Sequence, residues 1–103
     1  MSPRSQTIPR VRPVPVFEEQ LEPLYRVIIH NDDVTPMDFV ILILERIFQI
    51  KGQAAVAIML TAHYQGAAYV QTLPKSEAQN RIGKAHFAAG LEGFPLHFSM
   101  EPE

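Results

Sequence analysis

The fold of this 103-residue chain is decided by the stretch HNDDVTPM at residues 30–37. It separates two strongly apolar runs, LYRVII at residues 24–29 and FVILIL at residues 39–44. The first run favours a β-strand, and the second favours the start of a helix. The stretch therefore predicts a strand-to-helix junction that carries two carboxylates, an amide and an imidazole. Loops held between rigid elements often carry binding chemistry, although these residue types also build ordinary turns.

The second half of this stretch predicts how the first helix begins. Thr35 fits the N-cap, Pro36 the first helical position, and Asp38 the acid of a capping box. Asp38 would also lie where the helix dipole favours a negative charge. The helix is expected to run to about Ile50.

The rest of the chain predicts four further elements. Gly66 and Gly90 are expected to end the second and third helices, and Ser76 to cap the third. The order β-α-α-β-α-β predicts an α+β fold, a small α/β sandwich with a three-stranded antiparallel sheet packed against three helices. The four elements are a helix at residues 53–65, a strand at 67–73, a helix at 76–89 and a strand at 94–100.

The first 23 residues differ in composition from the rest, because they hold five of the nine prolines. Prolines at this density sustain neither a helix nor an inner strand. We therefore expect a flexible Pro-rich arm at residues 1–23 and one core domain at residues 24–103. The composition leaves open whether the arm is inert or engages a partner.

The bulk composition excludes several functions. The net charge of −2 gives no basic field for nucleic acid. The absence of cysteine excludes disulfides and thiolate chemistry. No apolar run approaches the roughly 20 residues of a membrane span, and the N-terminus shows no signal-peptide pattern. A cytoplasmic protein that contacts neither membrane nor nucleic acid is expected.

Three polar residues form the principal candidate site. Asn31 and Asp32 follow the first strand, and His63 lies near the end of the second helix, which must return to the sheet beside them. An amide oxygen, a carboxylate and an imidazole nitrogen would satisfy the three N–H donors and the charge of a primary ammonium. This set predicts a binding site for a primary ammonium group.

Apolar residues near the same turn predict a pocket beside the ammonium site. Methionines adapt to irregular bulky groups. An ammonium site next to an apolar pocket suits a free chain N-terminus that carries a large side chain. The expected lining residues are Met37, Val40, Met59, Ala62 and Leu96, with Thr35 at the turn.

Other interpretations of these residues remain open at this point. Asn31, Asp32 and Asp33 have the composition of ordinary turns and caps, and His63 fits a histidine near a helix C-terminus. His30, Asp32, Asp33 and His63 offer an N/O ligand set, although no paired-histidine spacing supports a metal site. None of the four serines lies in a nucleophile elbow, and there is no glycine-rich phosphate loop. We therefore expect neither catalytic residues nor a cofactor.

Two blocks of the sequence resemble the ClpS adaptor family. They are YRVIIHNDDVTPMDFV at residues 25–40 and IMLTAHYQG at residues 58–66, in the family's order and at its separation. The likeness extends from about residue 24 to the C-terminus.

The resemblance implies an adaptor that is not itself an enzyme. ClpS proteins bind substrates with an N-terminal Leu, Phe, Tyr or Trp, called N-degrons, and deliver them to the ClpA or ClpC unfoldase of the ClpP protease. By resemblance, Asn31, Asp32 and His63 hold the substrate α-amino group. Met37 acts as a gate against β-branched residues, and Val40, Met59, Ala62 and Leu96 match pocket walls. The family's extended arm helps to hand substrate to the unfoldase pore.

The sequence departs from the family pattern at Ala62, in the third helix and at Leu42, which replaces a position that is often polar in relatives. Ala62 stands where a valine is common, which is expected to widen the pocket. The residues matched to docking on the unfoldase N-terminal domain are Glu77, Gln79 and Arg81. Arg81 keeps the family's positive charge, whereas Gln79 replaces the usual acid and Glu77 lies two residues earlier. The alternative is therefore a ClpS-like paralogue that binds N-termini but has altered or lost unfoldase docking.

Overall fold

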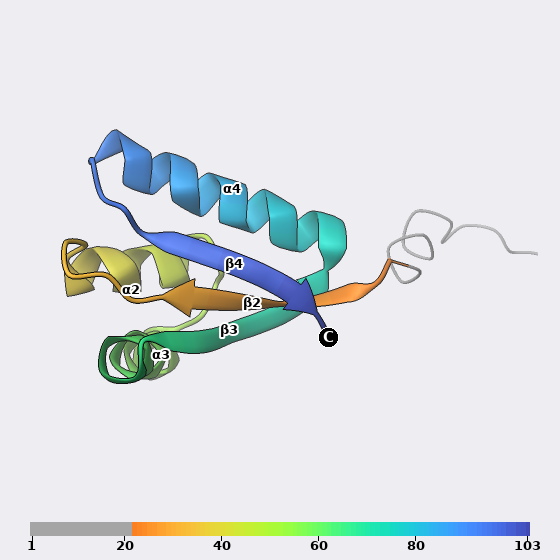
Figure 1. The fold of residues 1–103 in the computed structure, drawn as a ribbon, viewed down its shortest axis with the longest axis horizontal. Coiled ribbons are helices and arrows are strands. Elements are labelled where there is room, and N and C mark those ends of the chain that lie inside the picture. The colour runs from red at the N-terminus through yellow and green to blue at the C-terminus, as the bar shows by residue number, and fades with distance from the viewer. Residues whose placement is uncertain (1–21) are drawn as a thin grey trace, which may run out of the picture.

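The structure, a computed structural model, describes residues 22–103, so nearly all of the arm predicted at residues 1–23 lies outside the described residues. Six elements confirm the predicted order and the α+β class (Figure 1). No helix within the described part of the chain is long and apolar enough to cross a membrane. The elements are β2 (Leu24–His30), α2 (Met37–Arg46), α3 (Gly52–Gln65), β3 (Ala67–Pro74), α4 (Lys75–Leu91) and β4 (His97–Pro102).

Strand β2 lies at the centre of an antiparallel sheet with the order β3-β2-β4. His30, its last residue, pairs with Ala67 at the start of β3 and with His97 at the start of β4. Leu24, its first residue, pairs with Pro74 at the end of β3. One end of the sheet thus gathers the 31–36 loop, the end of α3 and the chain entering β4. The opposite end carries the start of α4.

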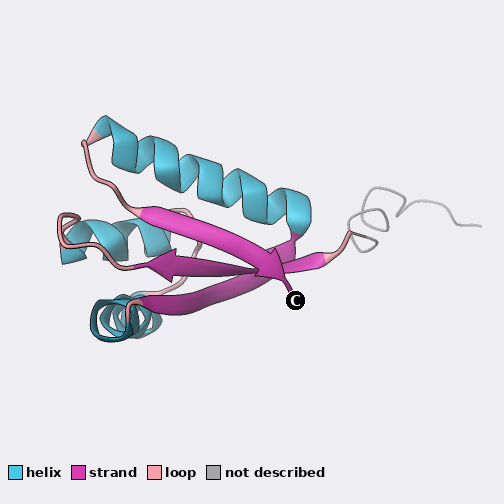
Figure 2. Cartoon of the chain, viewed as in Figure 1, coloured by secondary structure: helices cyan, strands magenta, loops and turns pink. Residues whose placement is uncertain are grey.

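The core lies between the sheet and the helices (Figure 2). Val27 and Ile29 point inward from β2 and are almost fully buried. From β4, Phe98 stacks on Phe48, with ring centroids 4.8 Å apart. Burying a side chain of this size contributes about 1.5–3 kcal/mol. The alternation of apolar side chains along the strands therefore determines which face of the sheet packs against the helices.

The first helix ends earlier than predicted. It stops at Arg46 rather than near Ile50, and Gln49 takes a left-handed conformation with φ of 58°. Beyond the helix, the Phe48 side chain is fully buried in the core. The Phe48 carbonyl oxygen then accepts hydrogen bonds from the side chains of Gln71 and Arg81.

The predicted boundaries of the last helix and strand also need correction. Gly90 does not end α4, which runs to Leu91 and is followed by Gly93 with φ of 76°. Residues 94–96 are not part of β4, because Phe94 instead packs edge-on against Phe39 with centroids 4.9 Å apart. Gly66 ends α3 as predicted.

Candidate binding site

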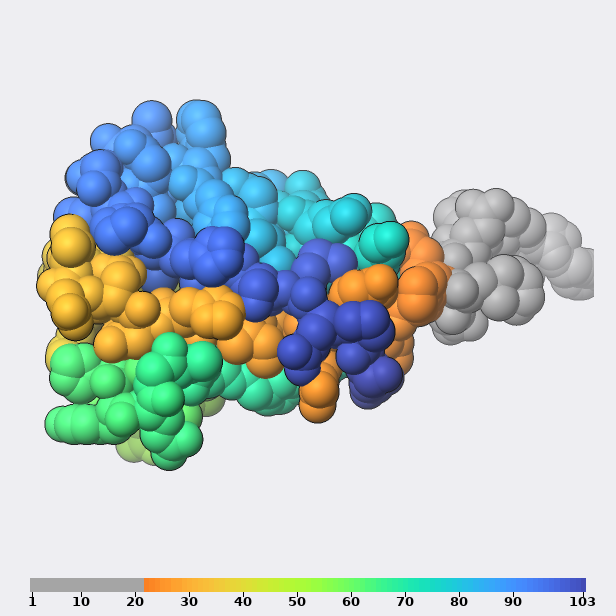
Figure 3. All heavy atoms as spheres, viewed as in Figure 1, coloured from red at the N-terminus to blue at the C-terminus, as the bar shows by residue number. Residues whose placement is uncertain are grey.

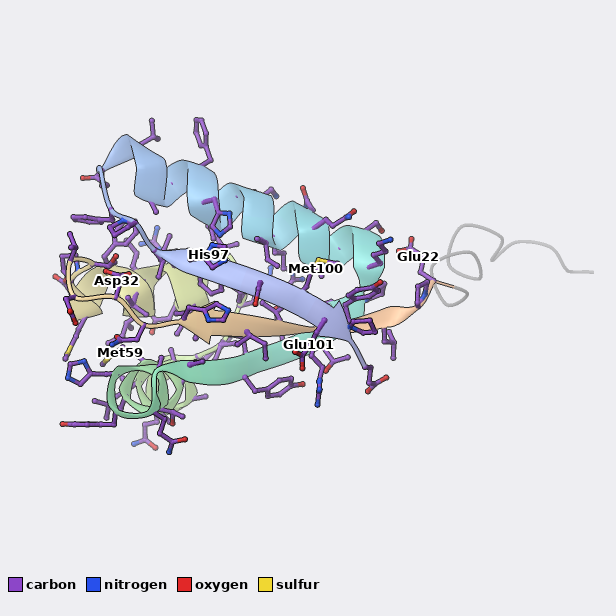
Figure 4. All side chains as sticks on the ribbon, viewed as in Figure 1. Glu22, Asp32, Met59, His97, Met100 and Glu101 are labelled. Atoms are coloured by element: carbon purple, nitrogen blue, oxygen red, sulfur yellow. The ribbon has the colours of Figure 1, made fainter. Side chains whose placement is uncertain are left out.

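A cavity of about 310 Å³ opens at the end of the sheet where β2 meets the 31–36 loop. In Figure 4, Asp32 and Met59 lie at this same end of the molecule, on the loop and on α3. The structure brings together every residue predicted for the ammonium site and the pocket. Those residues are Asn31, Asp32, Thr35, Met37, Val40, Met59, Ala62, His63 and Leu96.

A left-handed glycine joins the two elements that carry the polar residues. Gly66 has φ of 93°, and its N–H donates to the Ala62 carbonyl oxygen at 2.8 Å. Its own carbonyl oxygen accepts from the Asn31 N–H at 2.9 Å. Glycine adopts this conformation without the steric cost that a Cβ brings. The end of β2 is thereby tied to the end of α3, which sets Asn31 and His63 on the same cavity.

The carboxylate of Asp32 organises the loop. Its Oδ1 accepts from the Val34 N–H at 2.8 Å and from the Thr35 N–H at 2.7 Å. Its Oδ2 accepts from the Thr35 hydroxyl at 2.9 Å. The predicted N-cap at Thr35 is therefore wrong: its hydroxyl is turned back to Asp32, and no side chain caps α2. The Pro36 carbonyl oxygen begins the helical bonding, accepting from the N–H groups of residues 39 and 40.

These bonds also fix the charge of Asp32. Partial burial by itself would raise the pKa of this carboxyl group, but the bonds from Thr35 and Val34 outweigh it and lower the pKa below its usual value. A carboxylate that accepts several hydrogen bonds is stabilised in its charged form. The cavity therefore has a fixed negative charge at neutral pH.

The neighbouring acid, Asp33, lines the same cavity and is exposed. Its carboxylate makes no hydrogen bond or ion pair with another residue of the described range 22–103. The sequence predicted only turn or metal-ligand roles for Asp33. Its position directly after Asp32, in the turn at the end of β2, was the sequence signal that it also lines the cavity.

The cavity walls are apolar and mostly buried. Val40, Met59, Ala62 and Leu96 are each less than 8% exposed, whereas Met37 in the first turn of α2 is 44% exposed. Met37 therefore lies toward solvent and the other four line the interior. A ligand with a charged head and an apolar side chain would meet polar groups on the loop and apolar groups on the walls.

The two histidines beside the cavity have different surroundings. His63 is exposed, and its ring lies edge-on to Tyr64 with centroids 4.9 Å apart. His30 is bonded through Nε2 to the Ser99 hydroxyl at 2.6 Å, and its ring contacts that of His97. Both line the cavity with Asp32 and Asp33. Within residues 22–103, however, no three His, Asp or Glu side chains are arranged to hold a metal ion.

The residues matched to unfoldase docking lie on α4, whose first turn is at the opposite end of the sheet from the cavity. Glu77 and Arg81 form an ion pair at 2.7 Å. Arg81 also donates to the Gln71 side-chain oxygen at 3.1 Å and to the Phe48 carbonyl oxygen at 3.3 Å. Gln79 is exposed. Of the three, Gln79 alone is open to solvent without an internal partner among the described residues.

Comparisons with known proteins agree with this architecture. Residues 20–99 match the family model of the ATP-dependent Clp protease adaptor protein ClpS. An ATP-dependent Clp protease adapter protein ClpS 2 from Mesorhizobium japonicum is 38% identical over 101 residues, covering 98% of both chains. A ClpS adapter from Oleidesulfovibrio alaskensis is 41% identical over 88 residues, covering 84% of this chain and 85% of that one.

A solved structure has the same fold and contains a ligand. Agrobacterium tumefaciens ClpS2 bound to L-phenylalaninamide superposes with a TM-score of 0.76 at 36% identity, covering 79% of this chain and 98% of that chain. Sequence and fold together therefore define the class as a small Clp protease adaptor. The chain belongs to the ClpS family.

Proposed function

We propose that the cavity binds the first residue of a substrate protein through its free α-ammonium group and its bulky apolar side chain. The observation that carries this proposal is the junction of an ionised carboxylate, an amide and an imidazole with buried apolar walls in one cavity. The relative from Agrobacterium tumefaciens binds phenylalaninamide, which joins a free α-amine to a phenyl side chain.

Asn31, Asp32 and His63 would share the three N–H donors of the ammonium group. An ionised carboxylate has about four acceptor positions, and the loop occupies three of those on Asp32. Asp32 thus retains one position while it also holds the loop. Asp33 adds a second carboxylate to the same cavity. The charge that attracts the ammonium group is therefore shared between two acids.

The apolar walls would select the side chain. Val40, Met59 and Leu96 enclose it, and Met37 at the mouth would disfavour branching at Cβ, as in the family. Ala62 is only 4% exposed, so its small side chain faces the interior and leaves space that a valine would fill. We infer that the cavity admits the large residues Leu, Phe, Tyr and Trp.

Delivery of the bound substrate would use the other end of the molecule. We propose that α4, through Glu77, Gln79 and Arg81, docks on the N-terminal domain of a ClpA- or ClpC-type unfoldase in the cytoplasm. The arm of residues 1–23 would then help to transfer substrate, with residues 24–103 acting as the binding domain. The distance between the ends of the sheet lets substrate and unfoldase bind at the same time.

A second candidate is an N-terminus-binding paralogue that no longer docks. The observation that favours it is the engagement of Arg81 by Glu77, Gln71 and Phe48, which leaves it few donors for a partner. A pull-down with the N-terminal domain of ClpA or ClpC decides between the two. Association that an excess of untagged adaptor competes away supports delivery, and its absence supports the paralogue.

The cavity itself is tested with peptides that differ only in their first residue. Peptides beginning with Phe, Leu, Tyr or Trp should bind, whereas those beginning with Val or Ser should bind at least tenfold more weakly. Fluorescence anisotropy with the full chain gives the dissociation constants. Equal affinity for the Phe and Ser peptides would contradict the proposal.

A further inference from the structure

Helix α3 and strand β3 contribute no fully charged side chain to the surface of the molecule. From residue 52 to residue 74 the chain contains no Asp, Glu, Lys or Arg, although most of α3 is exposed. Only Ala55, Met59 and Ala62 of this helix are buried. Surface helices ordinarily carry charged residues on their solvent face. Core packing alone therefore does not explain the composition of α3.

Two exposed apolar residues of α3 continue from the cavity. Leu60 and Val56 lie three and seven residues before His63, and they are 38% and 37% exposed. Residues at these spacings share one side of a helix. His63, Leu60 and Val56 thus form a strip, here named the α3 strip, that starts at the cavity. Figure 3 shows α3, in green, adjoining the yellow 31–37 segment on the surface.

The spacing along the α3 strip matches that of an extended peptide. Leu60 and Val56 are four residues apart, which corresponds to about 6 Å along a helix axis. Alternate residues of an extended chain are about 6.7 Å apart and point to the same side. A chain that starts in the cavity and follows α3 would therefore place every second side chain on the strip.

We propose that the α3 strip is a second substrate subsite, which binds the third and fifth residues of a protein whose first residue occupies the cavity. This inference rests on the proposed function and extends it. The third side chain lies against Leu60 and the fifth against Val56. The recognised substrate is thus an extended N-terminal segment with apolar residues at positions 1, 3 and 5.

The chemistry of the strip sets the preference. An apolar side chain that covers Leu60 or Val56 removes apolar surface from water. A charged side chain at the same place loses hydration, and no charged residue of 52–74 compensates it. Acidic and basic residues at positions 3 and 5 should therefore both be disfavoured, which distinguishes this subsite from simple electrostatic attraction.

The test uses the full chain and four dye-labelled peptides of the form Phe-Ser-X-Ser-X-Ser, with X as Leu, Ser, Glu or Lys. The Leu peptide should bind about three- to tenfold more tightly than the Ser peptide, which corresponds to partial burial of two side chains. The Glu and Lys peptides should bind no more tightly than the Ser peptide. L-phenylalaninamide, measured as a competitor, reports on the cavity alone.

The outcomes separate this inference from the proposed function. Equal affinity for all four peptides, with phenylalaninamide still competing, would overturn the subsite and leave the cavity proposal standing. Tighter binding of the Glu or the Lys peptide than of the Leu peptide would also overturn the subsite. If neither phenylalaninamide nor any peptide binds, both proposals fail.

Variants locate the preference on α3. Leu60→Ser and Val56→Thr, which each alter one of the two contacts, should each lower the ratio of Leu-peptide to Ser-peptide affinity by about two- to threefold, and the double variant should bring it close to one. Leu91→Ser provides a matched control, because Leu91 is 71% exposed on α4. This variant should keep the wild-type ratio. A ratio unchanged by both α3 variants would contradict the assignment to the strip.

Discussion

At each end of the sheet, a carboxylate accepts two hydrogen bonds from a hydroxyl-bearing residue close to the start of a helix. At the cavity end, Asp32 accepts the N–H and the hydroxyl of Thr35 just before α2. At the other end, Glu22 accepts the N–H and the hydroxyl of Ser76 in the first turn of α4, at 2.9 and 2.8 Å. The first carboxylate is three residues away in sequence, and the second is 54 residues away.

The difference in separation gives the two carboxylates different consequences. Asp32 shapes a short loop and leaves its charge on a cavity. Glu22 instead fastens the chain entering β2 onto α4, helped by the bond from the Lys75 N–H to the Pro23 carbonyl oxygen. Bonds from Ser76 lower the pKa of Glu22 in the same way that the loop lowers that of Asp32. The comparison thus assigns a binding role to one carboxylate and a tethering role to the other.

The largest expected effect comes from Asp32→Ala. The variant removes a charge from the cavity and leaves the N–H groups of Val34 and Thr35 without their acceptor. Affinity for a Phe-initiated peptide should fall by about a hundredfold, and the free energy of unfolding by about 2 kcal/mol. Calorimetry and urea unfolding measure the two quantities. Unchanged affinity would show that the charge of the Asp32 carboxylate does not contribute to peptide binding.

Gly66→Ala should give the next largest effect. The added Cβ meets no atom within 4 Å, so the cost comes from the backbone at φ of 93° and amounts to about 1–2 kcal/mol of unfolding free energy. Peptide affinity should fall as well, because Gly66 positions Asn31. The matched control is Gly90→Ala, inside α4 and equally uncrowded, which should raise stability by up to about 1 kcal/mol. If both variants are destabilised equally, the left-handed conformation of Gly66 does not explain the cost of the Gly66→Ala substitution.

The pH dependence of stability should show the bonds to Asp32. Its pKa is lower in the folded chain than the value near 3.9 expected for an unfolded one. The resulting stabilisation is fully present above about pH 4 and is lost as the pH falls through the lowered folded pKa. The midpoint temperature of thermal unfolding should therefore fall more steeply below pH 4 for the wild type than for Asp32→Asn. Parallel curves would contradict this assignment.

The smallest effect is expected from Glu22→Gln. This side chain is only partly buried, and glutamine keeps an oxygen that accepts from the Ser76 N–H, so removing the charge should lower the unfolding midpoint only slightly. Affinity for the Phe peptide should remain that of the wild type, because the cavity lies at the other end of the sheet. Any large loss of affinity would show that the two ends are coupled.

The sequence predicted the parts of the molecule that depend on local patterns. The strand at residues 24–30, the order of the elements and the left-handed end of α3 follow from alternation, helical spacing and glycine placement. The cavity-lining set was predicted from the spacing of polar and apolar residues, with the resemblance to ClpS proteins supporting it. The strand and the helix end are encoded within a few residues of each other, whereas the cavity-lining set draws on residues from 31 to 96.

The incorrect predictions involve side-chain contacts that compete with the local signal. Thr35 and Ser76 both match a capping signature, yet each is engaged by a carboxylate. Just beyond the early end of α2, Phe48 stacks on Phe98, which is 50 residues later in the chain. Such competition between a local signal and a tertiary contact is decided by burial and geometry, which spacing alone does not contain.

The central claim is that the cavity recognises a free α-ammonium group, and one comparison of affinities tests it most directly. The full chain is titrated with a Phe-initiated peptide and with the same peptide acetylated at its N-terminus. Acetylation removes the charge and two of the three donors but retains the side chain. The account predicts that the free peptide binds and that acetylation weakens binding by at least a hundredfold. Equal affinities for the two peptides would contradict it.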